Sequence, residues 1–198
     1  MTTALLLLAV LVLILLNAFF VAAEFALVRV RRSRIEELAQ QEGRRGGRAT
    51  LMLSLLDDLS RYLAACQLGI TLTSLGIGFL GEPAIGSILE NLLGDGVPHW
   101  LSTAVSIGGA YLIATSLHIT LGEQIPKIYS IERAEQTALR IARPLKLFST
   151  VFRPMVVALN GASNWVLRRI GIIAIAGQRL GPDDAFHLFR PQPDARLR

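Results

Sequence analysis

Three glutamates lie inside or at the borders of apolar stretches, where ionisable side chains are rare. They are Glu24, Glu82 and Glu123. A carboxylate in hydrocarbon is unfavourable unless it is paired or faces a polar cavity, so each is a functional candidate. Glu123 belongs to the stretch TSLHITLGEQIPKIYS, residues 115–130. Gly122 and Pro126 predict a disturbed helix there, in which backbone carbonyls lose their partners.

Freed carbonyls, hydroxyls and one carboxylate form the oxygen-rich type of site that Mg²⁺ and other hard cations prefer. Hydroxyl side chains occur on this stretch and on the preceding apolar stretch. We therefore expect a metal site drawn from Glu123, Thr71, Ser74, Thr120 and Glu24. The alternative for the hydroxyls, including Thr73, Thr115 and Ser116, is helix-to-helix packing.

Each carboxylate also has a simpler interpretation. Glu123 lies four residues before Lys127 and could form an ion pair with it, although Pro126 disturbs that helical spacing. Glu24 could pair with Arg29 or reach the membrane interface. Glu82 is placed more simply at the outer surface beside a helix break.

Other chemistries find little support in the sequence. The single cysteine, Cys66, excludes a disulfide or a cysteine-based metal site within one chain and is expected to be a small buried side chain. His99 and His118 have no serine or cysteine at a catalytic spacing, and no Walker loop is present. We expect no enzyme, no catalytic residue and no nucleotide site.

Composition indicates an integral membrane protein. Of 198 residues, 52% are hydrophobic and 18% charged, and the mean hydropathy is +0.49. Seven arginines fall between Arg29 and Arg48, directly after an apolar stretch. In that position they indicate the cytoplasmic side of a membrane, and no motif supports nucleic-acid binding.

Three apolar stretches are long enough to cross a bilayer: residues 4–28, about 62–80 and 101–121. A signal peptide is the weaker interpretation of the first stretch, because no basic residues precede it. The arginines place the N-terminus outside the cell membrane. Gly-Glu-Pro at 81–83 should break the second helix and leave a short helix over 83–93, followed by a turn at 94–100.

The remaining segments are expected near the cytoplasmic side. Residues 31–41 and 50–61 predict short amphipathic helices separated by glycines, and 131–143 predicts a third. Residues 145–171 predict a helix lying in the inner interface, because basic residues flank both ends; a fourth span is the alternative. Residues 171–198 are expected to form a poorly ordered tail.

Three segments resemble a known family. NAFFVAAEFALVRVRRSRIEELA (17–39), RYLAACQLGITLTSLGIGFLGEPAI (61–85) and HITLGEQIPK (118–127) are similar to the transmembrane domain of the CorB/CorC and cyclin M (CNNM) family, whose bacterial members include haemolysin-C-like proteins with CBS domains. The resemblance covers residues 1–170.

The resemblance implies an all-α integral membrane fold with three transmembrane helices, short broken helices and a juxtamembrane belt helix on the cytoplasmic side. It also implies a homodimer in the cell membrane that exports Mg²⁺ coupled to Na⁺. The family's cation-binding glutamate corresponds to Glu123. Ala23 and Ile70 replace a serine and an asparagine of many relatives. The CBS domains that follow in relatives are not expected within these residues.

Two functions remain in competition. The first is the membrane domain of a divalent-cation transporter, with a cavity that reaches Glu123. The second is a non-transporting scaffold or regulator of another transporter, with Glu123 paired to a basic residue and no cavity reaching it. A pore-forming toxin fits the sequence poorly, because glycine-packed spans followed by arginines are typical of a resident membrane domain.

Overall fold

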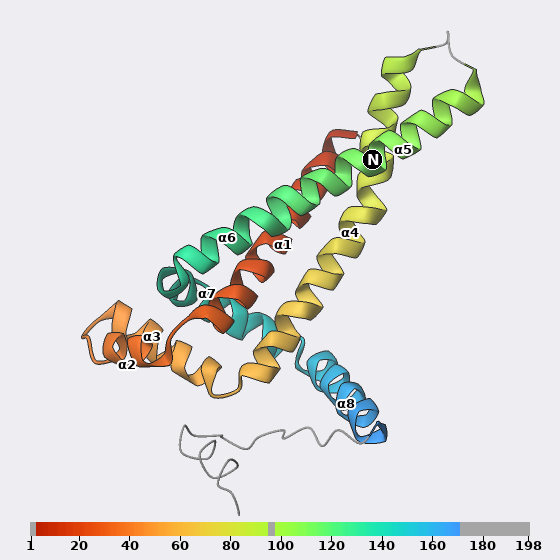
Figure 1. Cartoon of the computed structure of the whole chain (residues 1–198). Coiled ribbons are helices and arrows are strands. Elements are labelled where there is room, and N and C mark those ends of the chain that lie inside the picture. The colour runs from red at the N-terminus through yellow and green to blue at the C-terminus, as the bar shows by residue number, and fades with distance from the viewer. Residues whose placement is uncertain (1–2, 95–97, 171–198) are drawn as a thin grey trace, which may run out of the picture. The chain divides into compact units, whose positions relative to one another are not determined.

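The computed structural model describes residues 3–94 and 98–170, and in these ranges the protein consists of helices joined by short turns (Figure 1). The chain divides into two units, residues 1–160 and 161–198. The predicted tail, 171–198, lies outside the described residues.

Three helical stretches are long and apolar enough to cross a membrane, as the sequence predicts. The first is α1, Thr3–Arg29, and the second is α4, Leu59–Leu93. The third stretch runs from His99 to Glu132 and has three parts. These are α5, His99–Leu117; a π-helical segment, His118–Gln124; and α6, Ile125–Glu132.

The predicted break at Gly-Glu-Pro is wrong, because α4 is one continuous helix of 35 residues (Figure 1). Pro83 removes one backbone hydrogen bond, but Ala84, Ile85 and Gly86 are buried just beyond it. Ile85 packs with Ala110 and Ala114 of α5. Packing against the neighbouring helix therefore holds the chain helical through the proline.

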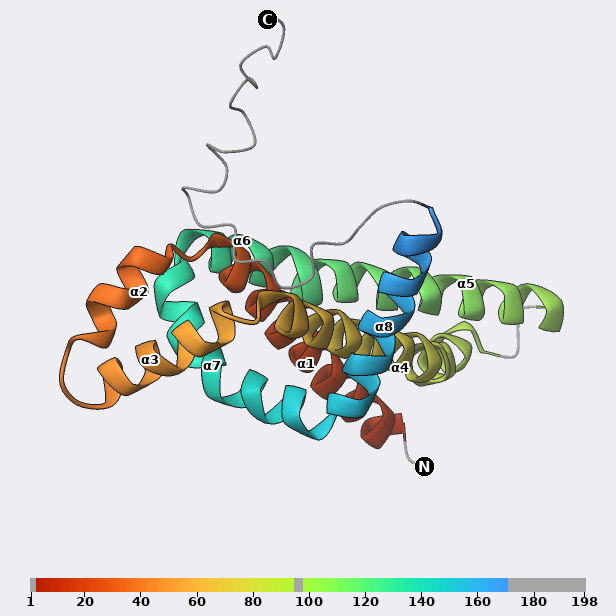
Figure 2. The ribbon, with the colours of Figure 1, turned by 90° about the horizontal axis from the view of Figure 1, so that it is seen from below.

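The first span packs against the second and also against α6 and the π-helical segment, and the second span packs against α5 (Figures 1 and 2). Glycines allow the close approaches. A Cβ on Gly69 would lie 2.5 Å from the Phe20 ring, and one on Gly81 would lie 3.1 Å from Ala114 Cβ. Both glycines therefore allow helices of the same chain to pack closely.

Short amphipathic helices surround the end of α1 where the arginines begin. They are α2, Arg32–Ala39; α3, Arg44–Leu56; and α7, Ala134–Val151. Their apolar faces share one core with the last turns of α1 and the start of α4, which includes Leu27, Ile35, Met52, Leu55 and Leu145. The predicted helix at 31–41 is confirmed. The predicted 50–61 helix is wrong in both bounds, because α3 contains Gly46 and Gly47 and ends at Leu56, and α4 begins at Leu59.

Arg32 forms one ion pair within α2 and one that connects α2 to the end of α3. Arg32 lies 2.9 Å from Asp57 and 3.0 Å from Glu36. The hydrogen bond to Asp57, with that to Glu36, raises the pKa of the Arg32 guanidinium above its ordinary value. These pairs are half-exposed, so they contribute about 0.2–1 kcal/mol each.

The predicted belt consists of two helices. The expected helix at 131–143 and the start of the expected helix at 145–171 form the single helix α7. The chain then breaks at Phe152, one residue before Arg153-Pro154, and continues as α8, Arg153–Arg169. Neither α7 nor α8 is among the three helical stretches suited to span a membrane in the described part of the chain, so a fourth span is not supported.

Candidate cation site between the three spans

A buried asparagine connects all three spans. Asn17, near the middle of α1, is fully buried. Its Nδ2 donates a hydrogen bond to the Gly122 carbonyl at 3.1 Å, and its Oδ1 accepts from Thr73 Oγ1 of α4 at 2.7 Å. Ser74 Oγ lies 3.4 Å from the same Oδ1. The amide therefore satisfies polar groups on α4 and on the π-helical segment together.

The sequence explains why the Gly122 carbonyl needs this partner. In an α-helix that carbonyl would accept from the N–H four residues later, but that residue is Pro126, which has none. The helix widens here into a π-helical segment, with the Ile125 N–H bonded to the Thr120 carbonyl five residues back. The predicted disturbance is confirmed as a widening of the helix instead of a break.

Glycine at position 122 allows Asn17 to come close. A Cβ at that position would lie 3.2 Å from Asn17 Nδ2 and 3.0 Å from His118 Cδ2. Both contacts are tighter than ordinary van der Waals distances, so a larger residue would push the amide away from the carbonyl.

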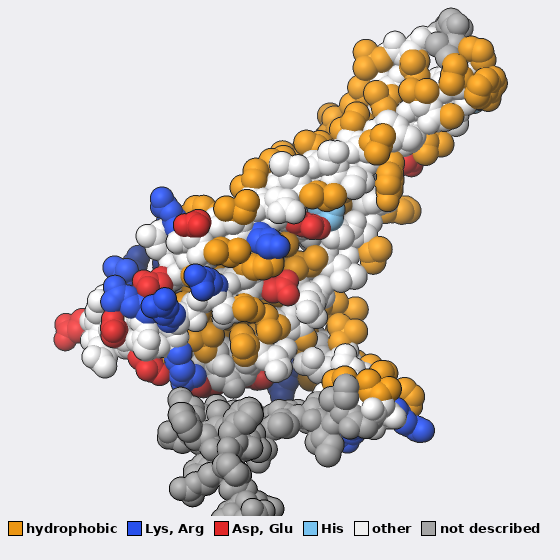
Figure 3. All heavy atoms as spheres, in the orientation of Figure 1, with side chains coloured by type: hydrophobic (Ala, Val, Ile, Leu, Met, Phe, Trp, Pro, Cys, Tyr) orange, Lys and Arg blue, Asp and Glu red, His pale blue; other side chains and the backbone are white. Residues whose placement is uncertain are grey.

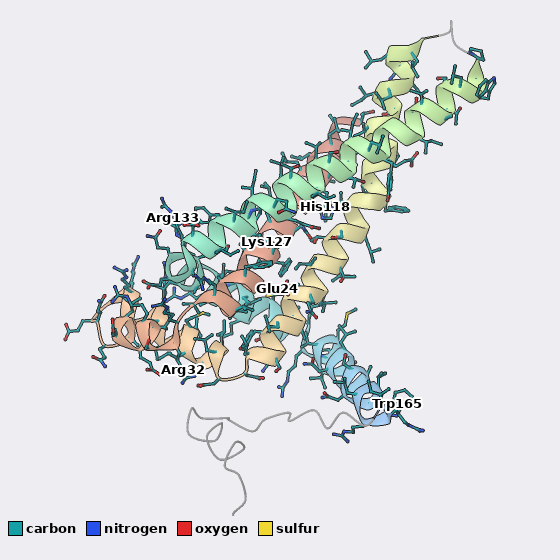
Figure 4. All side chains as sticks on the ribbon, in the orientation of Figure 1. Glu24, Arg32, His118, Lys127, Arg133 and Trp165 are labelled. Carbon is teal, nitrogen blue, oxygen red and sulfur yellow. The ribbon has the colours of Figure 1, made fainter. Side chains whose placement is uncertain are left out.

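Thr73, Asn17, Ser74, His118 and Glu123 form one polar chain, which continues from Ser74 to the third span. Ser74 Oγ lies 3.3 Å from His118 Nε2, and the same nitrogen lies 3.5 Å from Glu123 Oε1. The His118 side chain is 15% exposed and that of Glu123 is 42% exposed. Figure 4 shows His118 between the third span and α4. The alternative pair of Glu123 with Lys127 does not form; the Lys127 ammonium lies 4.9 Å from the centre of the Phe25 ring.

A cavity of about 180 Å³ lies beside this chain, between α4 and α5. Ser74 and His118 line it together with Thr115, Tyr111 and Glu82. Glu82 lies eight residues beyond Ser74 on α4, a rise of about 12 Å. The sequence favoured an outer-surface position beside a helix break for Glu82; the structure places it on a continuous helix, lining a cavity that contains two members of the polar chain.

The structure brings together only some of the predicted site residues. Glu123 and Ser74 belong to the polar chain. Thr71 is exposed and donates to the Gln67 carbonyl of its own helix at 2.8 Å, and Thr120 is exposed as well. Glu24 lies nearer the end of α1 where α2 begins (Figure 4), with no ion pair to another described residue.

Two members of the polar chain were not among the predicted ligands. The sequence prediction missed Asn17 and assigned Thr73 to helix packing. A signal existed for Asn17, because it is the only polar residue between positions 4 and 23. Oxygen atoms dominate the arrangement: one amide, two hydroxyls and one carboxylate. Residues 3–94 and 98–170 contain no cluster of three or more His, Cys, Asp or Glu side chains, so the arrangement offers one carboxylate and neutral oxygen atoms to a cation.

Comparison with known proteins identifies the family. The family model described as the cyclin M transmembrane N-terminal domain matches residues 7–190. UPF0053 protein YhdT of Bacillus subtilis is 48% identical over 162 residues, which is 81% of this chain and 34% of the relative. UPF0053 protein YugS of the same organism is 41% identical over 170 residues, 85% of this chain and 39% of the relative.

A more distant relative comes from another organism. The uncharacterized protein Rv1841c of Mycobacterium tuberculosis is 37% identical over 159 residues, 79% of this chain and 44% of the relative. The chain thus spans less than half of the length of these relatives. The resemblance predicted from the sequence is confirmed: this membrane protein belongs to the cyclin M (CNNM) transmembrane-domain family, the CorB/CorC type.

Proposed function

We propose that the chain is the membrane domain of a divalent-cation transporter, with Mg²⁺ as its substrate and Na⁺ as the coupling ion. The observation that carries the proposal is the polar chain from Thr73 through Asn17 to Glu123, which joins all three spans. Polar groups at this depth are unfavourable in hydrocarbon and mark ion pathways in membrane proteins.

The donor set suits a hard cation. Asn17 Oδ1, the Thr73 and Ser74 hydroxyls and the Glu123 carboxylate are oxygen ligands of the kind that Mg²⁺ takes. Mg²⁺ keeps several of its waters in protein sites, so a few protein oxygens are sufficient. A single carboxylate also binds less tightly than a closed cage, which favours release of a transported ion.

The cavity between α4 and α5 reaches Ser74 of this donor set and the neighbouring His118. It extends to Glu82, toward the end of α4 that is connected to α5. With the arginines after α1 on the cytoplasmic side, that end faces outward in the cell membrane, and so does the N-terminus. Glu82 then offers a negative charge at the outer part of the cavity.

Flux measurements test the proposal. The purified chain is reconstituted in liposomes with a trapped Mg²⁺ dye and a Na⁺ gradient, and wild type is compared with Glu123→Ala. Glu90→Ala is the matched control, because Glu90 is an exposed carboxylate near the C-terminal end of α4 and belongs neither to the polar chain nor to the cavity lining. We expect flux in wild type and the control, and loss of flux in Glu123→Ala. Equal flux in all three proteins would contradict the assignment of Glu123.

The second candidate is a scaffold or regulator of another transporter. It is favoured by one observation: Glu123 lies beside His118 and is not among the residues that line the cavity. This function requires no flux in wild type under any gradient. The liposome experiment therefore separates the two candidates directly.

The proposal includes a homodimer, following the family resemblance. Large apolar side chains of α4 and α5 remain exposed, including Leu75, Phe79 and Leu112. Either lipid or a second copy of the chain covers these faces in a membrane. Cross-linking in native membranes is expected to trap a dimer; a monomer alone would remove this part of the proposal.

A further inference from the structure

A second, larger pocket lies where α1 passes into α2 and α6 passes into α7. Its volume is about 580 Å³, and four arginines line it: Arg29, Arg31, Arg34 and Arg133. Figure 3 shows Lys and Arg side chains gathered with acidic ones over this end of α1 and α2. The pocket shares no residue with the polar chain of the candidate cation site.

Ion pairs already occupy one arginine and two of the three glutamates in the lining. Arg34 pairs with Glu37 on its own helix and with Glu135 of α7 at 3.4 Å. The hydrogen bond to Glu37 and the charge of Glu135 raise the pKa of the Arg34 guanidinium above its ordinary value. Glu132 is then the remaining acid in the lining, which also contains the other three arginines.

Those three arginines have donors to spare. Arg29 and Arg31 form no ion pair with any described residue, and Arg133 lies over the Tyr129 ring at 5.8 Å. A guanidinium presents five N–H donors in a planar fork that matches two oxygens of a phosphate. Three such groups around one pocket therefore suit a phosphate-bearing anion.

The first turn of α7 adds to the positive charge around the pocket. Residues 134–136 line the pocket, and the residue before them, Arg133, makes no side-chain cap to the helix. The free N–H groups of an 18-residue helix carry partial positive charge, which favours an anion there. The contribution is secondary to that of the arginines.

The position of the pocket points to the membrane as the source of the ligand. Arg29 is the last residue of α1 and directly follows the apolar stretch 4–28, so the pocket lies at the boundary between hydrocarbon and water. Ile131 also lines the pocket and is 37% exposed, which gives an acyl chain an apolar contact beside the charged groups.

We propose that this pocket binds the phosphate of an anionic phospholipid headgroup, held by Arg29, Arg31 and Arg133. The volume exceeds that of one phosphate and has room for a glycerol-type headgroup. Basic pockets of this kind beside membrane helices bind anionic headgroups electrostatically. The inference is independent of the proposed transport function.

Native mass spectrometry of the full chain in detergent tests the proposal, with phosphatidylglycerol and phosphatidylcholine as probes. Arg31→Gln/Arg133→Gln removes two pocket charges, and Arg44→Gln/Arg45→Gln is the matched control on the exposed start of α3. The single variant Arg133→Gln is included in case the double variant misfolds, and far-UV circular dichroism checks the helix content of all three variants.

We expect wild type to bind phosphatidylglycerol more tightly than phosphatidylcholine. The affinity for phosphatidylglycerol should fall on the order of tenfold in the pocket double variant. The control should change less than twofold. Equal binding of the two lipids, or an equal loss in pocket and control variants, would overturn the proposal. Pyrophosphate is the soluble probe: if it binds here more tightly than phosphatidylglycerol, the ligand is a soluble phosphate and the lipid assignment fails.

Discussion

The contact between Asn17 and Gly122 allows a double-mutant test of the central polar chain. Asn17→Leu keeps a side chain of similar size but removes the donor to the Gly122 carbonyl and the acceptor of Thr73. Thr73 retains the Gly69 carbonyl at 2.8 Å, so the loss falls mainly on Gly122. Pro126 supplies no N–H to replace the donor.

The size of the destabilisation follows from leaving one buried acceptor, the Gly122 carbonyl, without a donor. A buried group left without its partner costs about 1–3 kcal/mol in proteins, and side-chain hydrogen bonds in membrane proteins contribute about 0.6 and at most about 1.7 kcal/mol. We therefore expect Asn17→Leu to lower the free energy of unfolding by about 1–2 kcal/mol. SDS titration of the purified protein, followed by far-UV circular dichroism, measures it.

The second variant asks whether the carbonyl is the cause. Pro126→Ala restores an N–H four residues after Gly122, so the helix can satisfy that carbonyl without Asn17. In the Pro126→Ala background, Asn17→Leu should cost less than half of its effect in wild type. Equal costs in the two backgrounds, or a cost below about 0.5 kcal/mol in wild type, would refute this account of the site.

Two further predictions concern packing and surface charge. Gly69→Ala places a methyl group 2.5 Å from the rigid Phe20 ring and should destabilise the protein by about 1–3 kcal/mol. Gly78→Ala is the control, because its methyl group meets no atom within 4 Å and should not destabilise the protein. The same SDS titration compares the two variants. Arg32→Gln removes two half-exposed ion pairs and should lower the free energy of unfolding by at most about 2 kcal/mol at low salt. Because salt screens exposed pairs, the difference in stability from wild type should shrink in about 1 M NaCl. A loss of stability that does not depend on salt would contradict an electrostatic cause.

The sequence by itself determined the membrane-spanning architecture. Length and apolarity of a stretch are sums over neighbouring residues, so 4–28 and 101–121 indicated spans without any knowledge of their partners. Gly122 and Pro126 likewise predicted a disturbed helix from local chemistry alone. The amphipathic pattern of 31–41 predicted α2 for the same reason.

Boundaries and continuity depended on tertiary packing. Pro83 has the same local chemistry as other helix breakers, yet α4 continues through it because the following residues are buried against α5. The same principle explains α7, which contains Pro144 and joins two segments that the sequence separated. The sequence gives the free-energy cost of a proline inside a helix, but only the surrounding contacts decide whether the helix continues through it.

Only the tertiary structure decided which polar residues meet. Asn17 and Gly122 are separated by 105 positions, and their contact depends on the rotation of α1 against the third span. Thr71 and Thr73 are chemically alike, yet one faces outward and the other reaches the amide, because 100° per residue places them on different faces of α4. Sequence chemistry supplied the candidates, whereas helix rotation and packing selected among them.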